Sequence, residues 1–506
     1  MRLDKLFSEL SGEKRICGLD GSSVPDVSDV VYDSRAAAGR DGVLFACFRG
    51  TKFDGHDFAR SAAEAGCAAV LCERELSDLG NIPQIITHNV RAMMGEAAAI
   101  VYGRPAEKMT MIGLTGTNGK TTTAYIMRSV TRANGTATGM MGTIVRDDGA
   151  SETEASRTTP EGPDVQRLLA SMARNGVKCC VMEASSHGLD QGRLRGCKFD
   201  RVAFSNLTYE HQEYHDGMES YFAAKRLLFS DYTARGWRGA ANADDEYGRR
   251  LLKDFSEGVV GFTMDAELGK QNKYFFPINI STSVNGVKFD AVFPDGESAE
   301  FSSPLIGSYN ISNILESAAI ADSMSVPRDA IARGVKECVR VPGRLERYSF
   351  NNGVSVFIDF AHSPDGVEKV LRTLKEIKND GRLWILWGAG GDRSREKRPI
   401  VGKIMGKLAD KIVITSDNPR NENPNDIARD VEAGVLLVCG ADYDVIADRK
   451  KAVYSSLDRA KSGDVVLIAG KGPENYIEYG DYRVPFKDAD AVLEWAKERG
   501  VGCAQL

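Results

Sequence analysis

The sequence predicts an α/β protein of three domains, and three observations support this fold class. The chain has 506 residues, enough for about three domains of ordinary size. Short apolar runs alternate with helical patterns along most of its length, as they do where helices connect the strands of a parallel sheet. A glycine-rich segment followed by Lys-Thr stands between a strand pattern and a helix pattern at 109–135, which predicts a phosphate loop at the centre of the fold.

We place the domain boundaries near residues 105 and 340. This gives an N-terminal domain at 1–105, a central domain at 106–340 and a C-terminal domain at 341–506. The segment 97–105, which has a glycine and a proline near its end, is interpreted as the linker between the first two domains.

The composition limits the classes of function. The formal net charge is −6 and no basic domain is present, which argues against a nucleic-acid partner. No apolar run is long enough for a transmembrane helix and the first twenty residues lack a signal-peptide core, so we expect no membrane insertion and a cytoplasmic location. Ten cysteines without a CxxC pair predict reduced thiols and no zinc site.

The N-terminal region is typical of a small α/β unit. Strand patterns at 42–50 and 68–72 flank a helical pattern at 58–66. An Asp-Ser-Arg segment, Asp33 to Arg35, lies between strands and is interpreted as a turn closed by its own side chains.

The segment TGTNGKTTT, Thr115 to Thr123, carries the strongest chemical signal. Gly116 and Gly119 allow backbone N–H groups to point inward, and the start of the following helix adds its dipole. Lys120 supplies a mobile positive charge, and the hydroxyl of Thr121 is placed to bind a magnesium ion. A leucine stands where the usual spacing has its first glycine, so we interpret this as a variant phosphate loop rather than a chance turn.

Two further strand patterns of the central region end in polar residues. The run 177–182 ends in Glu183, and an acid at the end of the strand after a phosphate loop is where a magnesium ligand belongs. The next run leads to Asn206, and His211 and His215 follow before a helical pattern at 218–229. The two histidines fit a metal or a phosphate site, and the sequence does not choose between them.

Lys225 lies in that helical pattern, one turn from Tyr221 and from Phe229. One interpretation is a surface lysine. The other is an amine whose pKa is lowered by desolvation, which could react with carbon dioxide to give an anionic carbamate able to hold a metal.

The segment 270–303 changes character. Three apolar-alternating stretches separated by Asn285-Gly286 and Asp295-Gly296 predict an antiparallel flap on the parallel core.

The C-terminal region predicts a second doubly wound, Rossmann-like sheet from four apolar runs, 354–358, 383–387, 412–414 and 465–469. Their polar ends are Asp359, GAGGDR (388–393), DNPR (417–420) and the Gly470 to Glu474 turn. GAGGDR lacks the third glycine of a dinucleotide loop.

A basic run begins with the last residue of GAGGDR and consists of Arg393, Arg395, Lys397 and Arg398. One interpretation is a solvated surface. Its place at a strand end after a glycine turn favours anion binding instead.

Taken together, these motifs resemble the Mur ligases over essentially the whole chain. The resemblance is carried by TGTNGKTT, Glu183-Ala-Ser-Ser-His-Gly, Asn206, His211, Gly307-x-x-Asn310-x-x-Asn313, Gly343-Arg344, Asp359-x-Ala-His and Gly391-Asp-Arg. Asp33-Ser-Arg35, Thr158-Thr-Pro160 and DNPR resemble the family member that joins a diamino acid to UDP-N-acetylmuramoyl-L-alanyl-D-glutamate in peptidoglycan synthesis.

The resemblance implies a role for each motif, beginning with ATP and Mg²⁺ as cofactors. The central domain would be a P-loop ATPase domain, the first would bind the UDP-substrate and the last the amino acid. The implied ATP-binding residues are Gly116, Thr117, Asn118, Gly119, Lys120, Thr121, Thr122, Asn310, Arg344 and Asp359. The implied catalytic residues are Lys120, Glu183, His211 and Lys225, and the implied metal ligands are Thr121, Glu183, His211 and a carbamylated Lys225. The implied UDP-substrate residues are Tyr32, Ser34, Thr158, Thr159, Ser185, Gln191 and Arg193. The implied amino-acid-binding residues are Arg393, Asp417, Asn418, Pro419, Arg420, Gly470 and Glu474.

The DNPR form is the one associated with meso-diaminopimelate, and the chemistry agrees. This amino acid carries a distal carboxylate to which Arg420 and Arg393 could each make bidentate contacts, while Glu474 would meet its distal ammonium group. We therefore expect an ADP-forming ligase that phosphorylates a carboxylate and lets the amine attack the acyl phosphate. The alternatives are ligation of L-lysine or another diamino acid, or a P-loop ATPase regulator that has lost ligation.

Three residues depart from the family pattern: Glu210 replaces an aspartate, Arg157 an asparagine and Pro473 a histidine. None of them removes a phosphate or magnesium contact, but Arg157 lies beside the implied substrate residues. We expect a monomer.

Overall fold

The computed structural model describes residues 1–19, 24–50, 53–211, 213–378 and 380–505. Its contacts separate two compact units, each with hydrophobic clusters of its own. The first unit contains Met1–Phe276, Phe293–Glu297 and Asn313–Gly334, and the second contains Pro277–Val292, Ser298–Ser312 and Val335–Leu506. The three-domain division near residues 105 and 340 stays a prediction.

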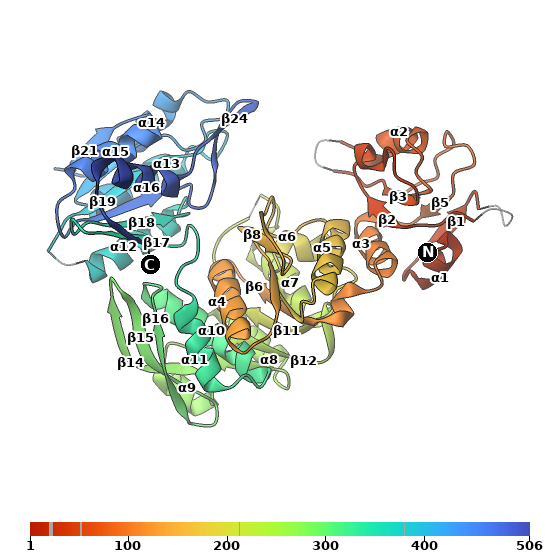
Figure 1. The fold of residues 1–506 in the computed structure, drawn as a ribbon, viewed down its shortest axis with the longest axis horizontal. Helices are drawn as coiled ribbons and strands as arrows, with labels where there is room; N and C mark the ends of the chain where they lie inside the picture. The colour runs from red at the N-terminus through yellow and green to blue at the C-terminus, as the bar shows by residue number, and fades with distance from the viewer. Residues whose placement is uncertain (20–23, 51–52, 212, 379, 506) are drawn as a thin grey trace. The chain divides into compact units, whose positions relative to one another are not determined.

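The first part of the chain folds around a five-stranded sheet in the order β1-β5-β4-β3-β2, with β1 antiparallel to β5 (Figure 1). The strands are β1 (Arg15–Cys17), β2 (Asp29–Val31), β3 (Val43–Ala46), β4 (Ala69–Cys72) and β5 (Gln84–Ile86). The helices are α1 (Leu3–Glu9), η1 (Ser34–Ala37), η2 (Gly55–Phe58), α2 (Ala59–Glu64), α3 (Val90–Val101) and η3 (Pro105–Lys108).

The linker prediction for 97–105 was wrong over its first half. Helix α3 continues to Val101, because Ala97, Ala98 and Ile100 are buried in the core of the N-terminal sheet. The chain leaves the helix only at Gly103, which has a φ of 72°.

The central part is an eight-stranded sheet in the order β13-β12-β11-β6-β10-β7-β8-β9. Strands β13 to β7 in this order are parallel, and β8 and β9 add an antiparallel edge. The strands are β6 (Thr110–Thr115), β7 (Thr138–Met141), β8 (Val145–Asp147), β9 (Glu152–Glu154), β10 (Cys179–Glu183), β11 (Phe199–Phe204), β12 (Thr233–Asn242) and β13 (Val259–Phe262). The helices are α4 (Lys120–Ala133), α5 (Gly162–Arg174), α6 (Ser186–Asp190), α7 (Gly217–Ser230), α8 (Glu246–Asp254) and α9 (Ala266–Asn272). The predicted order of strand, loop and helix around 115–123 is confirmed.

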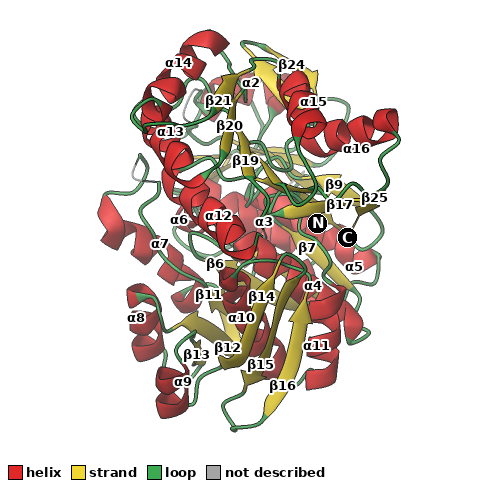
Figure 2. Ribbon diagram, turned by 90° about the vertical axis from the view of Figure 1, so that its left-hand side faces the viewer, coloured by secondary structure: helices red, strands yellow, loops and turns green. Residues whose placement is uncertain are grey.

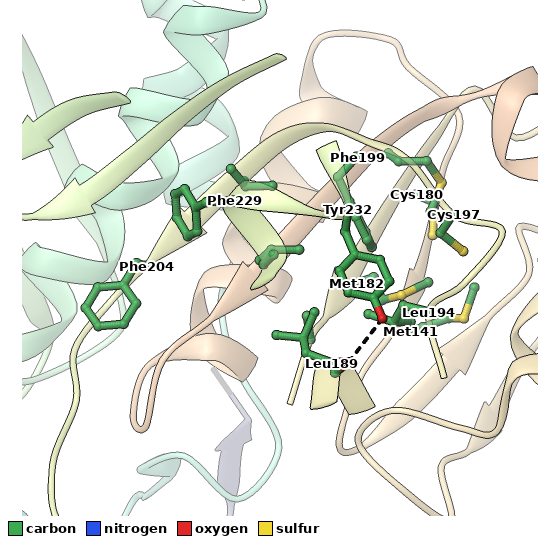
Figure 3. Packing of buried hydrophobic residues seen from close by; sticks show 14 of the residues in the cluster. Met141, Cys180, Met182, Leu189, Leu194, Cys197, Phe199, Phe204, Phe229 and Tyr232 are labelled. Carbon is green, nitrogen blue, oxygen red and sulfur yellow. Dashed lines mark hydrogen bonds between the residues drawn. The ribbon is translucent and has the colours of Figure 1, made fainter. Parts of the chain in front are cut away.

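Alternate residues of these strands build the core. Met182, Phe199 and Phe204 pack in one cluster with apolar residues of α5 and α7, as Figure 3 shows for its labelled members. Within the cluster, the hydroxyl of Tyr232 donates to the carbonyl of Leu189 over 3.0 Å, so its one polar atom is satisfied. Strands β6 and β10 are neighbours in this sheet. The phosphate loop after β6 and Glu183 at the end of β10 therefore lie at the same edge.

The predicted antiparallel flap is confirmed as a three-stranded sheet in the order β14-β15-β16 (Figure 1). The strands are β14 (Phe276–Ser283), β15 (Gly286–Val292) and β16 (Ser298–Ser303), and β15 pairs antiparallel with β16. Helices α10 (Ser308–Ser323) and α11 (Arg328–Glu337) follow it in the chain.

The C-terminal part is a seven-stranded sheet in the order β21-β20-β19-β22-β18-β17-β25. Its strands are β17 (Glu346–Phe350), β18 (Ser355–Asp359), β19 (Leu383–Trp387), β20 (Lys411–Ile414), β21 (Tyr443–Val445), β22 (Val465–Ala469) and β25 (Cys503–Gln505). Its helices are α12 (Pro364–Ile377), α13 (Lys397–Leu408), α14 (Pro424–Val435), α15 (Arg449–Arg459) and α16 (Asp488–Arg499). The four predicted strands are the adjacent parallel ones, β20-β19-β22-β18, which confirms the doubly wound prediction.

Both faces of this sheet are covered by helices, as the secondary-structure colouring in Figure 2 makes clear. Ile385 and Leu467 pack in the cluster that contains residues of α12, α13 and α14, whereas the neighbouring Leu386 and Ile468 pack with α15 and α16. This alternation explains why the strands read as continuous apolar runs. A separate hairpin, β23 (Tyr476–Tyr479) with β24 (Tyr482–Pro485), was not predicted. Within the described ranges, no helix is long and apolar enough to cross a membrane.

Candidate active site

The phosphate loop joins β6 to α4 and needs glycine at both of its motif positions. Gly116 and Gly119 have φ values of 141° and 96°, a region that L side chains rarely adopt. A Cβ atom at Gly116 would lie 2.0 Å from Oγ of Ser205, and one at Gly119 would lie 2.5 Å from Oδ1 of Asn313. The loop is thus closely surrounded, and its shape is fixed by its neighbours.

Lys120, the first residue of α4, bends back over the loop. Its Nζ donates to the carbonyls of Gly116 and Thr117 over 2.8 and 2.9 Å. The ammonium group therefore lies at the loop and at the N-terminus of α4, two features that both favour an anion there.

Thr121, in the first turn of α4, contacts Glu183, the last residue of β10. The hydroxyl of Thr121 donates to Oε2 of Glu183 over 3.0 Å, and Thr143 donates its N–H and hydroxyl to the same carboxylate over 2.8 and 3.0 Å. Glu183 is only 1% exposed. A hydroxyl and a carboxylate oxygen this close are the hard oxygen donors that Mg²⁺ prefers, so these residues fit the ion.

The outer wall of the loop comes from the end of β11. Asn206 accepts from the N–H of Asn118 over 3.0 Å, and Ser205 donates to the carbonyl of Asn118 over 2.5 Å. Thr117 lies 3.2 Å from the hydroxyl of Tyr221, and Thr122 is buried in the first turn of α4. Asn206, which the sequence analysis gave as a polar strand end and as a motif residue without a stated role, is therefore a structural partner of the loop.

Lys225 extends from α7 to the same loop. Its side chain is buried, with the residue 2% exposed, and its Nζ donates to the carbonyl of Gly116 over 2.7 Å. Burial lowers the pKa of the Lys225 amine well below its ordinary value, and the charge of Lys120 lowers it further. The interpretation of Lys225 as a surface lysine is wrong.

His211 lies in the loop before α7, with its side chain 40% exposed and its Nδ1 3.3 Å from a carboxylate oxygen of Glu213. Its ring packs edge to face against His187, 5.0 Å between centroids, and His187 also packs against His215 at 5.6 Å. Partial burial and the two neighbouring histidines lower the pKa of His187 to about 4. The sequence did not single out His187 by chemistry, although it lies in the Glu183 to Gly188 motif.

The residues predicted for the UDP-substrate form a connected polar surface next to Glu183. Thr159 donates to the carbonyl of Glu183 over 2.9 Å and accepts from Ser185, and Arg193 donates to the carbonyl of Thr159 over 2.9 Å and to Gln191 over 2.6 Å. The hydroxyl of Thr158 lies 3.0 Å from that of Thr143, the second partner of Glu183.

Two other predicted UDP-substrate residues come from the N-terminal sheet. The hydroxyl of Tyr32 donates to Asp164 on α5 over 2.6 Å, and Ser34 begins η1. Asp33 caps that short helix by accepting from the N–H of Arg35 over 3.0 Å, which confirms the predicted self-closed turn. Arg157, one of the family departures, pairs with Glu161 at 2.9 Å.

The second unit contains three predicted nucleotide residues: Asp359 at the end of β18, Arg344 just before β17, and Asn310 in α10. Asp359 is buried and accepts from the N–H groups of Leu345 and Ala361, both over 2.8 Å, and burial raises the pKa of its carboxyl. Arg344 lies 5.5 Å from the ring centroid of Phe360, and Asn310 donates to the carbonyl of Ile306 over 2.7 Å. The carboxylate of Asp359 thus holds the turn that presents Arg344.

The DNPR loop, Asp417 to Arg420, lies against the turn after β22. Asn418 donates to a carboxylate oxygen of Glu474 over 2.8 Å and accepts from Nζ of Lys471 over 3.1 Å. Lys471 is fully buried and also donates to Glu474 over 2.9 Å. Burial raises the pKa of the Asp417 carboxyl. Lys471 was not among the predicted site residues, although it stands between two of them in the sequence.

Close backbone approaches hold the loops of this site together. A Cβ at Gly391 would lie 1.8 Å from the carbonyl oxygen of Pro419, and one at Gly470 would lie 2.8 Å from Oδ2 of Asp417. Arg420 donates through Nη1 to the carbonyl of Gly391 over 2.7 Å.

The basic run after β19 separates into two kinds of residue. Arg393, the last residue of the GAGGDR segment, is exposed. Arg398 is 1% exposed and its guanidinium pairs with Glu422 and Asp430, both at 2.8 Å, while Arg395 pairs with Glu422 at 2.9 Å. The prediction that the whole run binds an anion was therefore wrong for Arg398, whose buried charge is bound by two acids. For Arg393, Arg395 and Lys397 it stays a prediction.

Comparison with known proteins places this geometry in a family. Residues 26–102 match the Mur ligase family catalytic domain, 114–321 the Mur ligase middle domain, and 343–472 the Mur ligase glutamate ligase domain. A Bacillus licheniformis protein named UDP-N-acetylmuramoyl-L-alanyl-D-glutamate--2,6-diaminopimelate ligase is 38% identical over 98% of this chain and 100% of its own. The chain belongs to the Mur ligase family.

Other relatives agree with this assignment. An Aquifex aeolicus protein with the same name is 40% identical over 90% of this chain and 91% of its own. A solved structure of a ligase with that name covers 94% of this Mur ligase and 95% of its own chain, with a TM-score of 0.66 and 29% identity. A MurF ligase from Thermotoga maritima, solved in complex with ADP, shares the fold with a TM-score of 0.62 at 17% identity over 93% and 97% of the two chains. This Mur ligase is accordingly an ATP-dependent, ADP-forming ligase.

Proposed function

We propose that this Mur ligase adds meso-diaminopimelate to UDP-N-acetylmuramoyl-L-alanyl-D-glutamate in peptidoglycan synthesis. The observation that carries the choice of amine is Arg420. Its guanidinium is held by Glu478 and by the carbonyl of Gly391, and within the described part of the chain Nη2 has no protein partner. An oriented, open guanidinium edge suits a carboxylate, which diaminopimelate has at its far end and lysine lacks.

The UDP-substrate would bind along the polar surface from Tyr32 to Arg193. Thr159 and Ser185 link this surface to the Glu183 backbone, and we expect a substrate bound there to have its terminal carboxylate near the phosphate loop. Arg193 supplies the positive charge, and its ion pair with Glu161 at 3.4 Å fixes its position.

The first chemical step is transfer of the γ-phosphoryl group of ATP to the substrate carboxylate, which gives an acyl phosphate and ADP. Lys120 would leave its carbonyl partners to bind the β- and γ-phosphates. Thr121 and Glu183 would hold a Mg²⁺ ion, which neutralises charge on the phosphates. The enzyme's contribution is mainly positioning and charge neutralisation, as in other phosphoryl transfers.

The second step forms the amide bond. The free amine of diaminopimelate attacks the carbonyl carbon, the tetrahedral intermediate loses phosphate as its C–O bond breaks, and the amine proton leaves to solvent. Asn310, Arg344 and Asp359 would bind the nucleotide. Asp417, Asn418, Arg420 and Glu474 would orient the amino acid, with the Asn418 amide already tied to Glu474.

Lys225 is proposed to act as a carbamate. Burial lowers the pKa of the Lys225 amine and so favours its neutral form, which is the form that reacts with carbon dioxide. The resulting carbamate, together with His211, would then be a ligand set for a second Mg²⁺ beside the acyl phosphate. The buried position of Lys225 at the loop carbonyl of Gly116 supports this role. We further propose a cytoplasmic monomer.

The test supplies the purified full-length protein with ATP, Mg²⁺ and the UDP-dipeptide, and offers meso-diaminopimelate, L-lysine or no amine. We expect an amide product, measured by mass spectrometry, and matching phosphate release with diaminopimelate. Product with lysine alone would refute the proposed amine. Phosphate release without any amide product would refute ligation altogether and favour an ATPase regulator.

A further inference from the structure

The β23–β24 hairpin holds the DNPR loop in an unfavourable backbone conformation. Arg420 has a φ of 52°, in the left-handed region that non-glycine residues seldom occupy. Such a conformation is strained and persists where the surroundings fix it. Here the N–H of Arg420 donates to the carbonyl of Glu478 over 3.0 Å, and its carbonyl accepts from the N–H of Gly480 over 2.9 Å.

Glu478 also fixes the Arg420 side chain. Its Oε2 accepts from Nε of Arg420 over 2.8 Å, and its backbone N–H donates to Oδ1 of Asn418 over 3.0 Å. One residue of the hairpin thus binds two residues of the DNPR loop through a side chain, an N–H and a carbonyl. With Nε held by Glu478 and Nη1 held by Gly391, the guanidinium plane has a single orientation.

From this arrangement, and resting on the proposed function, we propose that Glu478 is a positioning residue for diaminopimelate recognition, acting by aiming the Nη2 edge of Arg420 at the distal carboxylate of the amino acid. Bidentate recognition depends on the orientation of the guanidinium plane as much as on its charge. Two contacts that fix this plane before binding reduce the ordering cost of binding.

The ion pair with Arg420 is not the only one that Glu478 makes. The side chains of Arg420 and Glu478 are 21% and 22% exposed, so both groups are partly buried. Arg483 on β24 contacts the other carboxylate oxygen at 3.1 Å, so the carboxylate has a second cation available without Arg420. We therefore expect the contact between Glu478 and Arg420 to affect the geometry of the DNPR loop more than the stability of the hairpin.

The test compares steady-state kinetics of the wild type with Glu478→Gln and Arg420→Lys. We expect Glu478→Gln to raise KM for diaminopimelate about tenfold, the size of coupling found between contacting residues, with kcat and the KM values for ATP and the UDP-dipeptide unchanged. The double variant should have a KM no higher than Arg420→Lys alone, because Glu478 acts only through Arg420.

The matched control is Glu494→Gln, which removes another glutamate–cation contact of 2.8 Å, to Lys450, from the surface of the same unit. It should leave all kinetic constants unchanged, and both glutamine variants should keep their melting temperatures within about 3 °C. Glu478→Asp keeps the charge of the side chain. Its KM for diaminopimelate should lie between those of the wild type and Glu478→Gln.

Two results would separate the claims. If Arg420→Lys raises KM for diaminopimelate and Glu478→Gln does not, the positioning role is wrong and the proposed amine site stands. If Arg420→Lys itself leaves that KM unchanged, the proposed amine site is wrong, and the role of Glu478 is refuted with it.

Discussion

The phosphate loop and the DNPR loop both contain basic side chains, but these side chains have different kinds of hydrogen-bond partner. At the phosphate loop, Lys120 and Lys225 both donate to the carbonyl of Gly116. At the DNPR loop, Arg420 pairs with the carboxylate of Glu478. The first site therefore uses partial charges of the backbone, and the second uses full charges of side chains.

The difference corresponds to what each site must recognise. A carbonyl is a weak partner for an ammonium group, so under the proposed function an incoming phosphate would readily replace it, and the loop would select for negative charge. A carboxylate partner fixes the guanidinium plane of Arg420, so under the same proposal the DNPR loop would select for shape. Predictions that change one residue at a time can break or sharpen this contrast.

The largest expected effect is that of Lys225→Ala. If Lys225 acts as a carbamate, its loss should lower kcat by about a thousandfold, the scale of removing one electrostatic contact to the transition state. Short carboxylic acids should restore part of the activity by occupying the vacated position. The measurement is ligation rate with and without added acetate or formate.

Lys198→Ala provides the control for that experiment, because this exposed lysine also donates to a backbone carbonyl, that of Asp231, over 2.7 Å. It should be fully active and unaffected by acetate. Full activity of Lys225→Ala would remove the carbamate from the mechanism and leave the phosphate loop with Lys120 as its working cation.

Glu183→Gln should have the next largest effect. The amide keeps an oxygen for Thr121 but loses the charge that Mg²⁺ requires, so we expect kcat to fall about a hundredfold and the Mg²⁺ concentration for half-maximal activity to rise. A Mg²⁺ titration of the ligation rate measures both. A reduced rate with an unchanged Mg²⁺ requirement would show that Glu183 acts only by holding Thr121 and Thr143.

Arg420→Lys should have a smaller and more selective effect. A lysine keeps the charge but cannot form the fork, so KM for diaminopimelate should rise about tenfold while KM for ATP changes little. The readout is the pair of KM values from one set of initial rates. Equal changes in both would mean that Arg420 supports the loop in general and does not select the amine.

The phosphate loop was predictable because its chemistry is local or follows from strand order. TGTNGKTTT is continuous in sequence, and Glu183 could be placed beside Thr121, 62 residues away, because neighbouring parallel strands end at the same edge of a sheet. The same reasoning located the four strand ends of the C-terminal sheet and therefore the DNPR loop.

The contacts that complete the DNPR site were not predictable from the sequence. Glu478 is 58 residues from Arg420 and lies on a short hairpin outside the main sheet, so no strand-order rule brings the two together. The burial of Arg398 was not predicted for a related reason. Its partners Glu422 and Asp430 come next to it only in the folded protein. Ion-pair partners of this kind are set by tertiary packing, which a linear pattern does not encode.

The smallest expected effect on catalysis concerns Glu316, a buried acid behind the phosphate loop that accepts from Thr123 over 2.9 Å. Burial raises its pKa to about 8 from an ordinary 4.5, against the opposing effects of Thr123 and Lys120. The folded protein thus keeps a proton that the unfolded chain releases. This contribution to stability is complete below about pH 4.5 and is lost as the pH rises through about 8.

Glu316→Gln keeps an oxygen acceptor for Thr123 and removes the titration. The melting temperature of the variant relative to the wild type should therefore rise between about pH 4.5 and about pH 8. The difference in unfolding free energy should change by at most about 1.4 kcal/mol per pH unit over that range, while kcat changes little. The control is Glu337→Gln, which replaces an exposed glutamate at the end of α11. Its melting temperature should change with pH as that of the wild type does over the same range. If the melting temperature of Glu316→Gln also follows that of the wild type at every pH, Glu316 is ionised in the folded protein. The phosphate loop would then have a full negative charge behind it, and its contrast with the carboxylate-lined DNPR loop would be smaller than the hydrogen bonds of Lys120 and Lys225 indicate.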